Sequence, residues 1–544
     1  MKADAYPHSV NNIELIETHI SWVILTGKYA YKIKKAINLG YLKATTLQER
    51  IHYCKEELRL NQRLDPNLYI GLSIIVGPHQ KAKVSEEEID FKYKNAKSLM
   101  NEKIIEVAVR MYQFPQRKLV LNSIRINSLP KDSISKLALK LADFHNSAEK
   151  APIKSEYGNF NSILDSAKNN LDILIKLDRE KENHIFLIEH KIWLNEKILL
   201  LKKKFNSRKN NSAIRECHGD LHLGNIRISQ KGKLEVFDSI DFNPGLRWID
   251  PISEIAFLMI DLEVNGLLED SIKLINKWIE ETGDYRGLEL LNWYSAYRCL
   301  VRAKVLAIRI QQISQSRESS IIKDKDVKRS LSQLKKYIEK AKCIQFRKAK
   351  ILIIMHGLSG SGKSYLSEIL YKRLSAIRIR SDVERHRLYG HNKIPEGFGI
   401  TNKIPKDKYI YSKEYSDLLF MHHIPTLTKM TLRGGVSTIV DATFLRQRER
   451  KAMLSIAKEY KIPFIIIKCE NKDSVAYKRL NERMAKKNDP SEADFNTRTK
   501  QKSFLEEITQ EEKPCTILYK EGTNIKDLIR EIELVISNHK YVIK

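Results

Sequence analysis

The chain has 544 residues, of which 42% are hydrophobic, and its formal net charge is +29 at pH 7. This length exceeds one ordinary core, so two or three domains are expected. No apolar run approaches the roughly 18 residues of a membrane helix, and the start, MKADAYPHSV, lacks the apolar segment of a signal peptide, so we expect a cytoplasmic protein without a membrane partner.

The cysteines and the positive charge limit the other classes. The six cysteines are scattered without a CxxC pair, which argues against a disulfide framework and a zinc site. A charge of +29 raises the hypothesis of nucleic-acid binding, because Lys and Arg bind phosphate backbones. The basic residues are spread over the whole length, however, and aromatic residues for base stacking are only weakly interleaved with them. Nucleic acid is therefore an alternative partner and is not favoured over anionic small molecules.

The first part of the chain reads as a small β-rich lobe followed by a larger helical lobe. Two strand-like runs flank the turn 26–28 in WVILTGKYAYKIKK, and the helical stretch TLQERIHYCKEELRLNQRL follows. Further strands are expected at LYIGLSIIV and IIEVAVRMYQF, before SISKLALKLADFHNSAE begins a long helical section. The polar, helical segment 317–349 then gives way to the apolar run ILIIMHG, which predicts a domain boundary near 345.

The stretch CHGDLHLGNIRISQKGKLEVFDSIDF, 217–242, is the first candidate site. NIRIS and KLEVF flank a three-residue turn and predict an antiparallel hairpin, with Asn225 and Asp238 at its open end and Asp220 on the loop that enters it. Carboxylate and amide oxygens suit Mg²⁺ that carries nucleotide phosphates. By this reasoning Asn225 and Asp238 bind Mg²⁺, while Asp220 orients or deprotonates an acceptor hydroxyl. Asp241 is a rival metal ligand or a turn acid.

HGDLHLGN and the following VFD resemble the aminoglycoside phosphotransferase family, relatives of the protein kinases, over roughly residues 15–300. The resemblance implies a two-lobed kinase-like fold with ATP as the phosphate donor. His218 and His222 would organise the loop by hydrogen bonding. Asp250 resembles a further acid of the family pattern, and a helix N-cap explains it equally well.

A kinase-like fold needs a strand lysine for the α- and β-phosphates and a helix glutamate that holds this lysine. In YAYKIKK, Ala30 and Lys32 share a strand face, as in the V-A-I-K strand of kinases, so Lys32 is predicted to be this lysine, with Lys34 as the alternative. Glu57 in KEELRLN is the predicted partner, with Glu56 behind it. No G-x-G-x-x-G pattern precedes the strand, which reads ETHISWVIL instead.

The second candidate site is ILIIMHGLSGSGKSYLSEIL, a buried strand, a glycine loop and a helix. The loop fits G-x-x-x-x-G-K-[ST], and its predicted ATP-binding residues are Gly357, Gly360, Gly362, Lys363 and Ser364. In such a loop backbone N–H groups surround the phosphates, the lysine reaches the β- and γ-phosphates, and the serine hydroxyl binds Mg²⁺.

Two acids follow strand-like runs beyond this loop. Asp382 ends AIRIRSD and Asp441 ends STIVD, so both are expected at the carboxyl edge of a parallel sheet, where ligands bind. We predict Asp382 as the base for a substrate hydroxyl and Asp441 as the acid near Mg²⁺; caps or solvated loops are the alternatives. Arg479 and Arg483, four residues apart on one helix, would stabilise charge on the phosphates, or form an exposed basic helix.

From roughly 350 to 535 the chain resembles small P-loop kinases of the zeta-toxin, gluconate-kinase and polynucleotide-kinase-like group. THISWV, EELRLN, RWIDPISEIAFL and RSDVERHRLYG, in this order, resemble a bacterial two-domain family in which an aminoglycoside phosphotransferase-like domain is fused to an ATP-binding P-loop domain. The implied fold class is an α+β protein-kinase-like two-lobed domain, 1–345, followed by an α/β P-loop NTPase domain with a mainly parallel sheet, 346–544.

These patterns favour a bifunctional phosphotransferase that uses ATP and Mg²⁺ at two unrelated sites and acts on hydroxyl acceptors, with a small molecule as the leading acceptor. One alternative is a regulatory ATP-binding protein whose kinase-like half is inactive, which the missing glycine pattern favours. Another is a kinase that processes nucleic-acid ends, which the charge of +29 favours. The sequence leaves the oligomeric state open.

Overall fold

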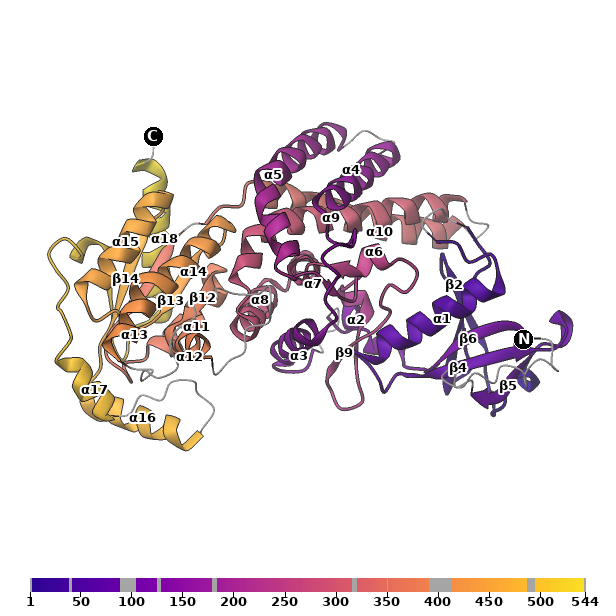
Figure 1. Cartoon of the computed structure of the whole chain (residues 1–544), viewed down its shortest axis with the longest axis horizontal. Helices are drawn as coiled ribbons and strands as arrows, with labels where there is room; N and C mark the ends of the chain where they lie inside the picture. Colours follow the sequence, from indigo (N-terminus) through magenta and orange to yellow (C-terminus); the bar gives the residue numbers. More distant parts are fainter. Residues whose placement is uncertain are drawn as a thin grey trace. The chain divides into compact units, whose positions relative to one another are not determined.

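The computed structural model describes residues 2–38, 42–88, 104–124, 129–178, 183–315, 320–349, 351–390, 412–486 and 495–542 (Figure 1). Contacts divide the chain into two compact units, the first made of residues 1–158 and 214–258 and the second of residues 159–213 and 259–544. The domain boundary expected near 345 falls inside the second unit and stays a prediction. Within the described ranges no helix is both long and apolar enough to cross a membrane.

The first unit contains an antiparallel sheet of six strands within its described residues, in the order β1-β2-β3-β6-β4-β5. Its strands are β1 (Glu14–Glu17), β2 (Ser21–Leu25), β3 (Tyr29–Lys34), β4 (Tyr69–Val76), β5 (Lys83–Glu88) and β6 (Ile104–Tyr112). The hairpin expected at 26–28 is confirmed, because β2 pairs antiparallel with β3. Gly27 supplies the positive φ of 90° that the turn requires.

Helix α1 (Leu47–Gln62) packs on this sheet and carries Glu57. Its start is fixed by a capping box, in which Thr46 and Glu49 satisfy each other's backbone N–H groups. Its apolar side, with Cys54, joins the sheet core around Val107 and Val109. Glu57 is therefore directed into the unit rather than toward solvent.

The rest of the described first unit contains the predicted hairpin and the short helices and strands around it. It contains α2 (Val120–Ile124), α3 (Ser133–Ser147), β7 (Arg215–Glu216), β8 (Ile226–Ile228), β9 (Leu234–Val236), α6 (Pro244–Arg247) and β10 (Trp248–Ile249). Strands β8 and β9 pair antiparallel with Ile226 opposite Val236, which confirms the hairpin. Helix α7 (Pro251–Val264) begins in this unit and ends in the second.

The second unit combines long helices with a parallel sheet. Its first helices are α4 (Phe160–Leu177), α5 (His184–Asn210), α8 (Leu268–Thr282), α9 (Tyr285–Gln315) and α10 (Ser320–Gln345). The described part of the sheet has five strands in the order β12-β13-β11-β14-β15, all parallel. The predicted fold class, an antiparallel kinase-like part followed by an α/β P-loop part, is confirmed.

The P-loop part of the second unit consists of the parallel sheet and the helices that connect its strands. The strands are β11 (Leu352–His356), β12 (Ile377–Arg380), β13 (Thr438–Asp441), β14 (Phe464–Cys469) and β15 (Thr516–Tyr519). The helices are α11 (Lys363–Leu374), α12 (Ser381–Tyr389), α13 (Lys413–Leu418), η6 (Leu419–His423), α14 (Ile424–Arg433), α15 (Gln447–Tyr460), α16 (Asp473–Lys486), α17 (Phe495–Lys502) and α18 (Ile525–Val542).

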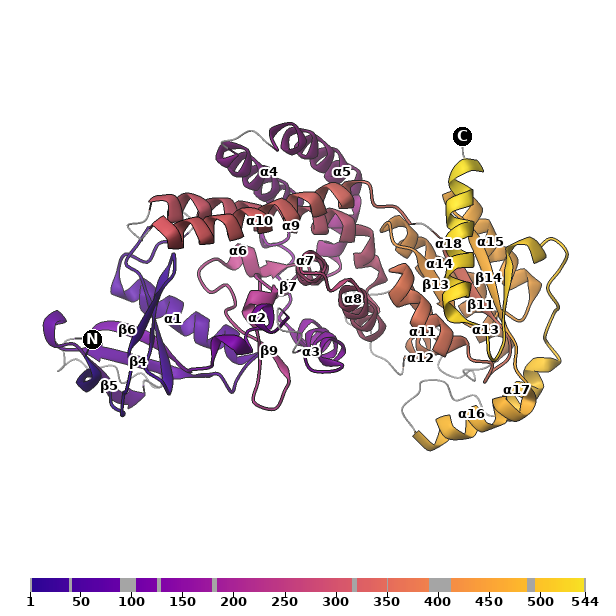
Figure 2. The same cartoon turned by 180° about the vertical axis from the view of Figure 1, so that it is seen from behind.

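Helix α8 covers the edge strand β12 and lies next to α11 (Figure 2). The side chain of Asn276 takes the place of a neighbouring strand: its Nδ2 donates to Ala376 O at 3.0 Å, and the Arg378 N–H donates to its Oδ1 at 2.7 Å. An exposed edge would otherwise present these backbone groups for pairing with another chain. A helix that precedes the predicted boundary thus completes the P-loop sheet.

Replacing Asn276 by Ala is expected to loosen β12, because two backbone groups lose their partners in a buried place. The cost of such a loss is about 1–3 kcal/mol, so amide hydrogen exchange across 376–380 should speed up about 5- to 100-fold. Hydrogen exchange with mass spectrometry measures this. Asn169→Ala on the exposed side of α4 is the matched control. Unchanged exchange at β12 would contradict this role of Asn276.

Candidate active sites

The hairpin β8–β9 brings the three residues predicted for the first site together. The Phe237 N–H donates to Asn225 O at 3.0 Å, and Asp238 follows directly. Asn225 Nδ2 donates to the backbone oxygen of Asp220 at 3.0 Å and to its carboxylate at 3.3 Å. Asp238 has a φ of 66°, and its N–H donates to the hydroxyl of Tyr69 at 3.1 Å. This left-handed turn directs the Asp238 side chain back toward the sheet.

A network of charges joins the sheet, α1 and the hairpin. Lys32 Nζ lies 2.7 Å from one carboxylate oxygen of Glu57 and 2.5 Å from Asp238. Lys34 Nζ lies 2.6 Å from the other oxygen of Glu57 and 2.6 Å from Asp241. Both lysines that the sequence left as alternatives therefore bind Glu57, and each is also paired with its own aspartate.

Exposure separates the two lysine–aspartate pairs. The side chain of Asp238 is 45% exposed, whereas those of Lys34 and Asp241 are 2% and 4% exposed. Asp238 can thus be reached by a metal ion, while Asp241, the rival ligand, is enclosed with Lys34. Glu56, the residue behind Glu57, binds Arg59 and Arg247 instead of either lysine.

The pKa values of this network follow from burial and pairing. Burial alone would raise the pKa of Glu57, but the charges of Lys32 and Lys34 outweigh it and lower that pKa. For Asp238 the partial loss of water around its carboxylate is likewise outweighed, by Lys32, and the pKa is lowered. For Asp241 burial prevails over Lys34, so its pKa is raised. Burial would lower the pKa of Lys32, yet Asp238 and Glu57 raise it well above its usual value, which keeps this lysine cationic.

The loop around Asp220 is held from both sides by hydrogen bonds. His218 Nε2 contacts Phe237 O at 2.9 Å, and the Asp220 N–H donates to His218 Nδ1 at 3.2 Å. His222 accepts from the Gly224 N–H at 3.0 Å and lies 3.4 Å from the Asp220 carboxylate. Both histidines thus make the kind of loop contacts that the sequence suggested.

The sequence analysis missed two residues that support this loop, Glu254 and His145. The buried carboxylate of Glu254 accepts from the Gly219 N–H at 2.7 Å, and its second oxygen contacts His145 Nε2 at 2.7 Å. A charged residue inside the apolar run ISEIAFLMI was the signal that could have indicated Glu254. Asp250 accepts from the Ile252 N–H at 3.1 Å, which agrees with the capping explanation.

The P-loop of the second unit lies between β11 and α11. Gly357, Gly360 and Gly362 have φ values of 134°, 80° and 98°, which side chains rarely allow. At Gly357 a Cβ would also lie 2.4 Å from Cys469 O, so the loop can pass β14 only with glycine there. Lys363 Nζ donates to Leu358 O at 2.8 Å, across the loop.

The predicted metal-binding pair lies beneath this loop. Ser364 Oγ donates to Asp441 Oδ1 at 3.3 Å, and Ser367 Oγ donates to Asp441 Oδ2 at 3.0 Å. Asp441 ends β13, next to the P-loop strand β11, and Asp382 follows the neighbouring strand β12. The parallel order therefore brings both acids to the same edge of the sheet.

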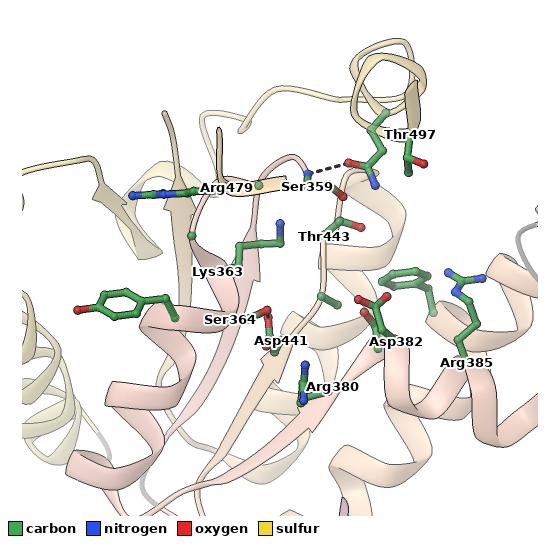
Figure 3. A pocket seen from close by; sticks show the side chains of 17 residues that line it. Ser359, Lys363, Ser364, Arg380, Asp382, Arg385, Asp441, Thr443, Arg479 and Thr497 are labelled. Atoms are coloured by element: carbon green, nitrogen blue, oxygen red, sulfur yellow. Dashed lines mark hydrogen bonds between the residues drawn. The ribbon is translucent and has the colours of Figure 1, made fainter. Parts of the chain in front are cut away.

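These residues surround a cavity of about 460 Å³ (Figure 3). The predicted site residues that line it are Gly360, Gly362, Lys363, Ser364, Asp382, Asp441 and Arg479. Arg479 on α16 lies against Gly362, since a Cβ there would be 3.1 Å from its Nη1. The side chain of Arg483 lies outside the described residues. The remaining lining includes Arg385 and Phe420, which the sequence analysis did not single out.

Helix α17 binds the P-loop through two residues that the sequence analysis missed. Arg498 is buried, and its Nη1 donates to Ser359 O at 2.6 Å while Nη2 lies 2.9 Å from Asp473. Gln501 accepts from the Ser359 N–H at 2.8 Å (Figure 3). No local pattern indicates these contacts, because they join residues 142 and 139 positions apart.

The segment with Asp382 is fixed from behind by a buried carboxylate. Glu384 is 1% exposed; it accepts from the Tyr285 hydroxyl at 3.1 Å, lies 3.0 Å from His423 Nε2, and contacts Arg387. Burial would raise the pKa of Glu384, but Arg387 and His423 lower it to about 2. Tyr285 belongs to α9, so this helix helps to position α12.

The P-loop region matches a family model of known proteins. Residues 352–508 match the family model described as AAA domain. An uncharacterized protein of Mycobacterium tuberculosis strain H37Rv is 24% identical over 460 residues, 84% of this chain and 83% of the relative, and one of Mycobacterium bovis gives the same values.

Solved structures of two kinds are similar to this chain. A choline/ethanolamine kinase family protein from Mesorhizobium loti is 10% identical, covering 61% of this chain and 93% of its own, with a TM-score of 0.32. A gluconokinase from Sinorhizobium meliloti is 18% identical, covering 35% of this chain and 94% of its own, with a TM-score of 0.24. The family match over residues 352–508 agrees with the P-loop domain inferred from the motifs.

The pairing of Glu384 predicts how stability depends on pH. Its folded pKa lies below the ordinary value of 4.5, so it stabilises the fold above pH 4.5 and loses this effect as the pH falls toward 2. Glu384→Gln is therefore expected to be less stable than wild type by about 3 kcal/mol at pH 6, and the difference should shrink below pH 4.

Urea unfolding of the full chain between pH 3 and 7 measures this difference. Glu459→Gln, at a half-exposed glutamate paired with Lys429, is the control and should show little change. A difference between Glu384→Gln and wild type that stays constant over this pH range would contradict the pairing.

Proposed function

We propose that the chain is an ATP-dependent phosphotransferase with two active sites, each of which transfers the γ-phosphate of ATP to a hydroxyl group. The observation that carries this proposal is the convergence of Lys363, the Ser364–Asp441 pair and Asp382 on one cavity. A phosphate-binding loop, an oxygen pair and a separate carboxylate are the parts that phosphoryl transfer to a hydroxyl requires. Simple nucleotide binding would not need Asp382 at that place.

At the P-loop site the residues act by positioning and by offsetting charge. Asp382 accepts the proton of the acceptor hydroxyl as the hydroxyl oxygen bonds to the γ-phosphorus. The bond from this phosphorus to the bridging oxygen breaks, and ADP leaves. Lys363 and Arg479 line the cavity beside the glycine loop, where they would offset the negative charge of the phosphates. The oxygens of Ser364 and Asp441 fit Mg²⁺, which when bound neutralises phosphate charge.

At the first site Asp220 has the corresponding role of base, and Lys32 binds the α- and β-phosphates while Glu57 holds it. Asp238 and Asn225 supply the oxygen atoms that Mg²⁺ prefers. Since Lys32 already lies against Asp238, nucleotide binding requires only that this contact be exchanged for one to the phosphates. Lys34 keeps Glu57 in place during the exchange.

Turnover of the full chain tests the two-site proposal. ATP is supplied with Mg²⁺ and a metabolite extract, and ADP and free phosphate are measured separately. Asp220→Asn and Lys363→Ala are each expected to remove a distinct part of the ADP formation, by about 100-fold or more for that part, because a base or a phosphate-binding lysine is lost.

The matched controls are Asp143→Asn, at an exposed aspartate on α3, and Lys372→Ala, at a partly exposed lysine on α11 that is paired with Glu368. Turnover that depends on Lys363 alone and appears entirely as free phosphate would contradict the proposal, and it would favour a regulatory ATP-binding role for the first site.

Substitutions of Asp238 and Asp241 test which of these two aspartates binds Mg²⁺ and which supports the structure. Asp238→Asn is expected to weaken Mg²⁺-dependent binding of a fluorescent ATP analogue at least about 10-fold, because a charged ligand is removed. Asp241→Asn should retain this Mg²⁺ dependence but lower the unfolding temperature, since Lys34 is left buried with one partner fewer. The reverse assignment would follow if Asp241→Asn alone abolished the effect of Mg²⁺. Titrations in the Lys363→Ala background isolate the first site.

A further inference from the structure

The buried carboxylate of Glu216 is a charged group that the proposed mechanism does not use. It lies at the end of β7, four residues before Asp220, and its side chain is 3% exposed. Its Oε1 accepts from Arg59 Nη2 at 2.7 Å and from Arg247 Nε at 3.1 Å. Its Oε2 accepts from Arg59 Nη1 at 3.0 Å and from Arg63 Nη1 at 3.1 Å. One carboxylate thus binds three guanidinium groups through charge-assisted contacts, which fix the geometry of their partners closely.

The three arginines belong to two different elements of the first unit. Arg59 and Arg63 lie on α1, the helix that presents a glutamate to the ATP-binding lysine, and Arg247 is the last residue of α6. Arg247 Nη1 also donates to Asp241 O at 3.1 Å, in the segment that follows the hairpin. Glu216 therefore connects α1, the start of the loop with the proposed base, and the segment after β9.

Arg63 holds the backbone at the start of this loop. Its Nη1 donates to Glu216 O at 2.9 Å, and its Nη2 donates to Cys217 O at 3.4 Å. The same guanidinium group lies 5.1 Å from the ring centre of Phe144 on α3, a cation–π contact that restricts its movement. Only two residues separate this backbone from Asp220, so a shift here passes to the carboxylate of the proposed base.

The charges of this cluster depend on one another. Burial would raise the pKa of Glu216, but the three arginines outweigh it and lower that pKa, which keeps the carboxylate charged. The carboxylates of Glu216 and Glu56 raise the pKa of Arg59. For Arg63 burial prevails and lowers the pKa, and among the described residues this arginine pairs with no carboxylate besides Glu216. Loss of the Glu216 charge would therefore leave a largely buried guanidinium group without a counter-ion beside the Asp220 loop.

We infer that Glu216 is a positioning residue of the first site, which fixes the loop of Asp220 relative to α1. Its carboxylate is enclosed by the arginines, so it acts on the reaction only through this loop. The loop then holds Asp220 within hydrogen-bond reach of an acceptor hydroxyl while ATP is bound on the side of Lys32. This inference rests on the proposed function of the first site.

The geometry predicts that Glu216 matters for phosphoryl transfer and much less for ATP binding. Glu57 keeps its contacts to Lys32 and Lys34, which do not involve Glu216, so ATP affinity should survive a change at this residue. Transfer should be slowed, because a misplacement of a reacting group by about 1 Å can cost about 100-fold in rate. A role in stability alone would reduce the number of folded sites and leave the rate per site unchanged.

Turnover per intact site tests this difference. The full chain with Lys363→Ala, which silences the P-loop site, receives ATP, Mg²⁺ and a metabolite extract, and a fluorescent ATP analogue counts the sites that bind nucleotide. Glu216→Gln is expected to lower the Asp220-dependent ADP formation per site about 10- to 100-fold and to change the Kd of the analogue less than about 3-fold. Glu189→Gln, at an exposed glutamate on α5, is the matched control.

A second variant covers the case in which the buried substitution prevents folding. Arg59 is 46% exposed, and Arg59→Gln removes one of the two α1 contacts while Glu216 keeps Arg63 and Arg247. The same selective loss of rate is expected, about 3- to 10-fold, with partial recovery in Arg59→Lys. Arg117→Gln, at an exposed arginine of the first unit, is the matched control.

A lower rate per site beside an unchanged ATP affinity is the result that supports the positioning role of Glu216. Rates per site that stay unchanged in both variants, or an ATP affinity that falls as much as the rate, would overturn it. If the chain with Glu216 intact shows no Asp220-dependent turnover, the proposed function of the first site fails, and the positioning role with it.

Discussion

The buried carboxylate of Glu57 is the point on which the first site depends. A carboxylate without partners in such a place would take up a proton, because burial disfavours the charged form. Glu57 stays charged because Lys32 and Lys34 each bind one of its oxygens. Both lysines lie on β3 and Glu57 lies on α1, so this contact fixes the helix to the sheet. Asp238 and Asp241 then attach the segment after β9 to the same pair of lysines.

Paired charges also position residues of the second site, but only those around Asp382. Asp382 is held at the cavity because its neighbours on either side are fixed: Arg380 contacts Glu280, and Glu384 contacts Tyr285. Both anchors come from earlier helices: Glu280 lies on α8 and Tyr285 on α9, each about 70 residues before the start of the P-loop strand. The P-loop itself relies on glycine conformation and on α17 instead. The P-loop and the Asp382 side of one cavity are thus supported by different parts of the chain.

The sequence predicts those features that are local or that follow from strand order. Period-two alternation indicated that Ala30 and Lys32 share a strand face, and the turn 230–232 indicated the hairpin that joins Asn225 to Asp238. The spacing of the P-loop and the positions of Asp382 and Asp441 after strands sufficed to place both acids at one edge of the sheet. The sequence favoured Lys32 but left Lys34 as an alternative, because the two lysines differ mainly in the exposure of their aspartate partners, Asp238 and Asp241.

Contacts between distant segments left no signal of this kind. Asn276 completes the edge of β12 from 100 residues away, and Arg498 binds Ser359 from 139 residues away. The change in composition near 345 predicts a domain boundary. It does not indicate that α8, which precedes this boundary, covers the edge strand β12. Arg385 was passed over because, in RSDVERHRLYG, it looks like any charged residue of an exposed helix; in the fold it is buried and contacts Ser416 on α13.

The number of nucleotides bound per chain tests most directly whether the two sites are independent. Isothermal titration of the full chain with a non-hydrolysable ATP analogue and Mg²⁺ is expected to give two equivalents, falling to one in Lys363→Ala and to one in Lys32→Met. Two equivalents in each variant, or a single equivalent in the wild type that Lys363→Ala abolishes, would contradict the presence of two ATP sites.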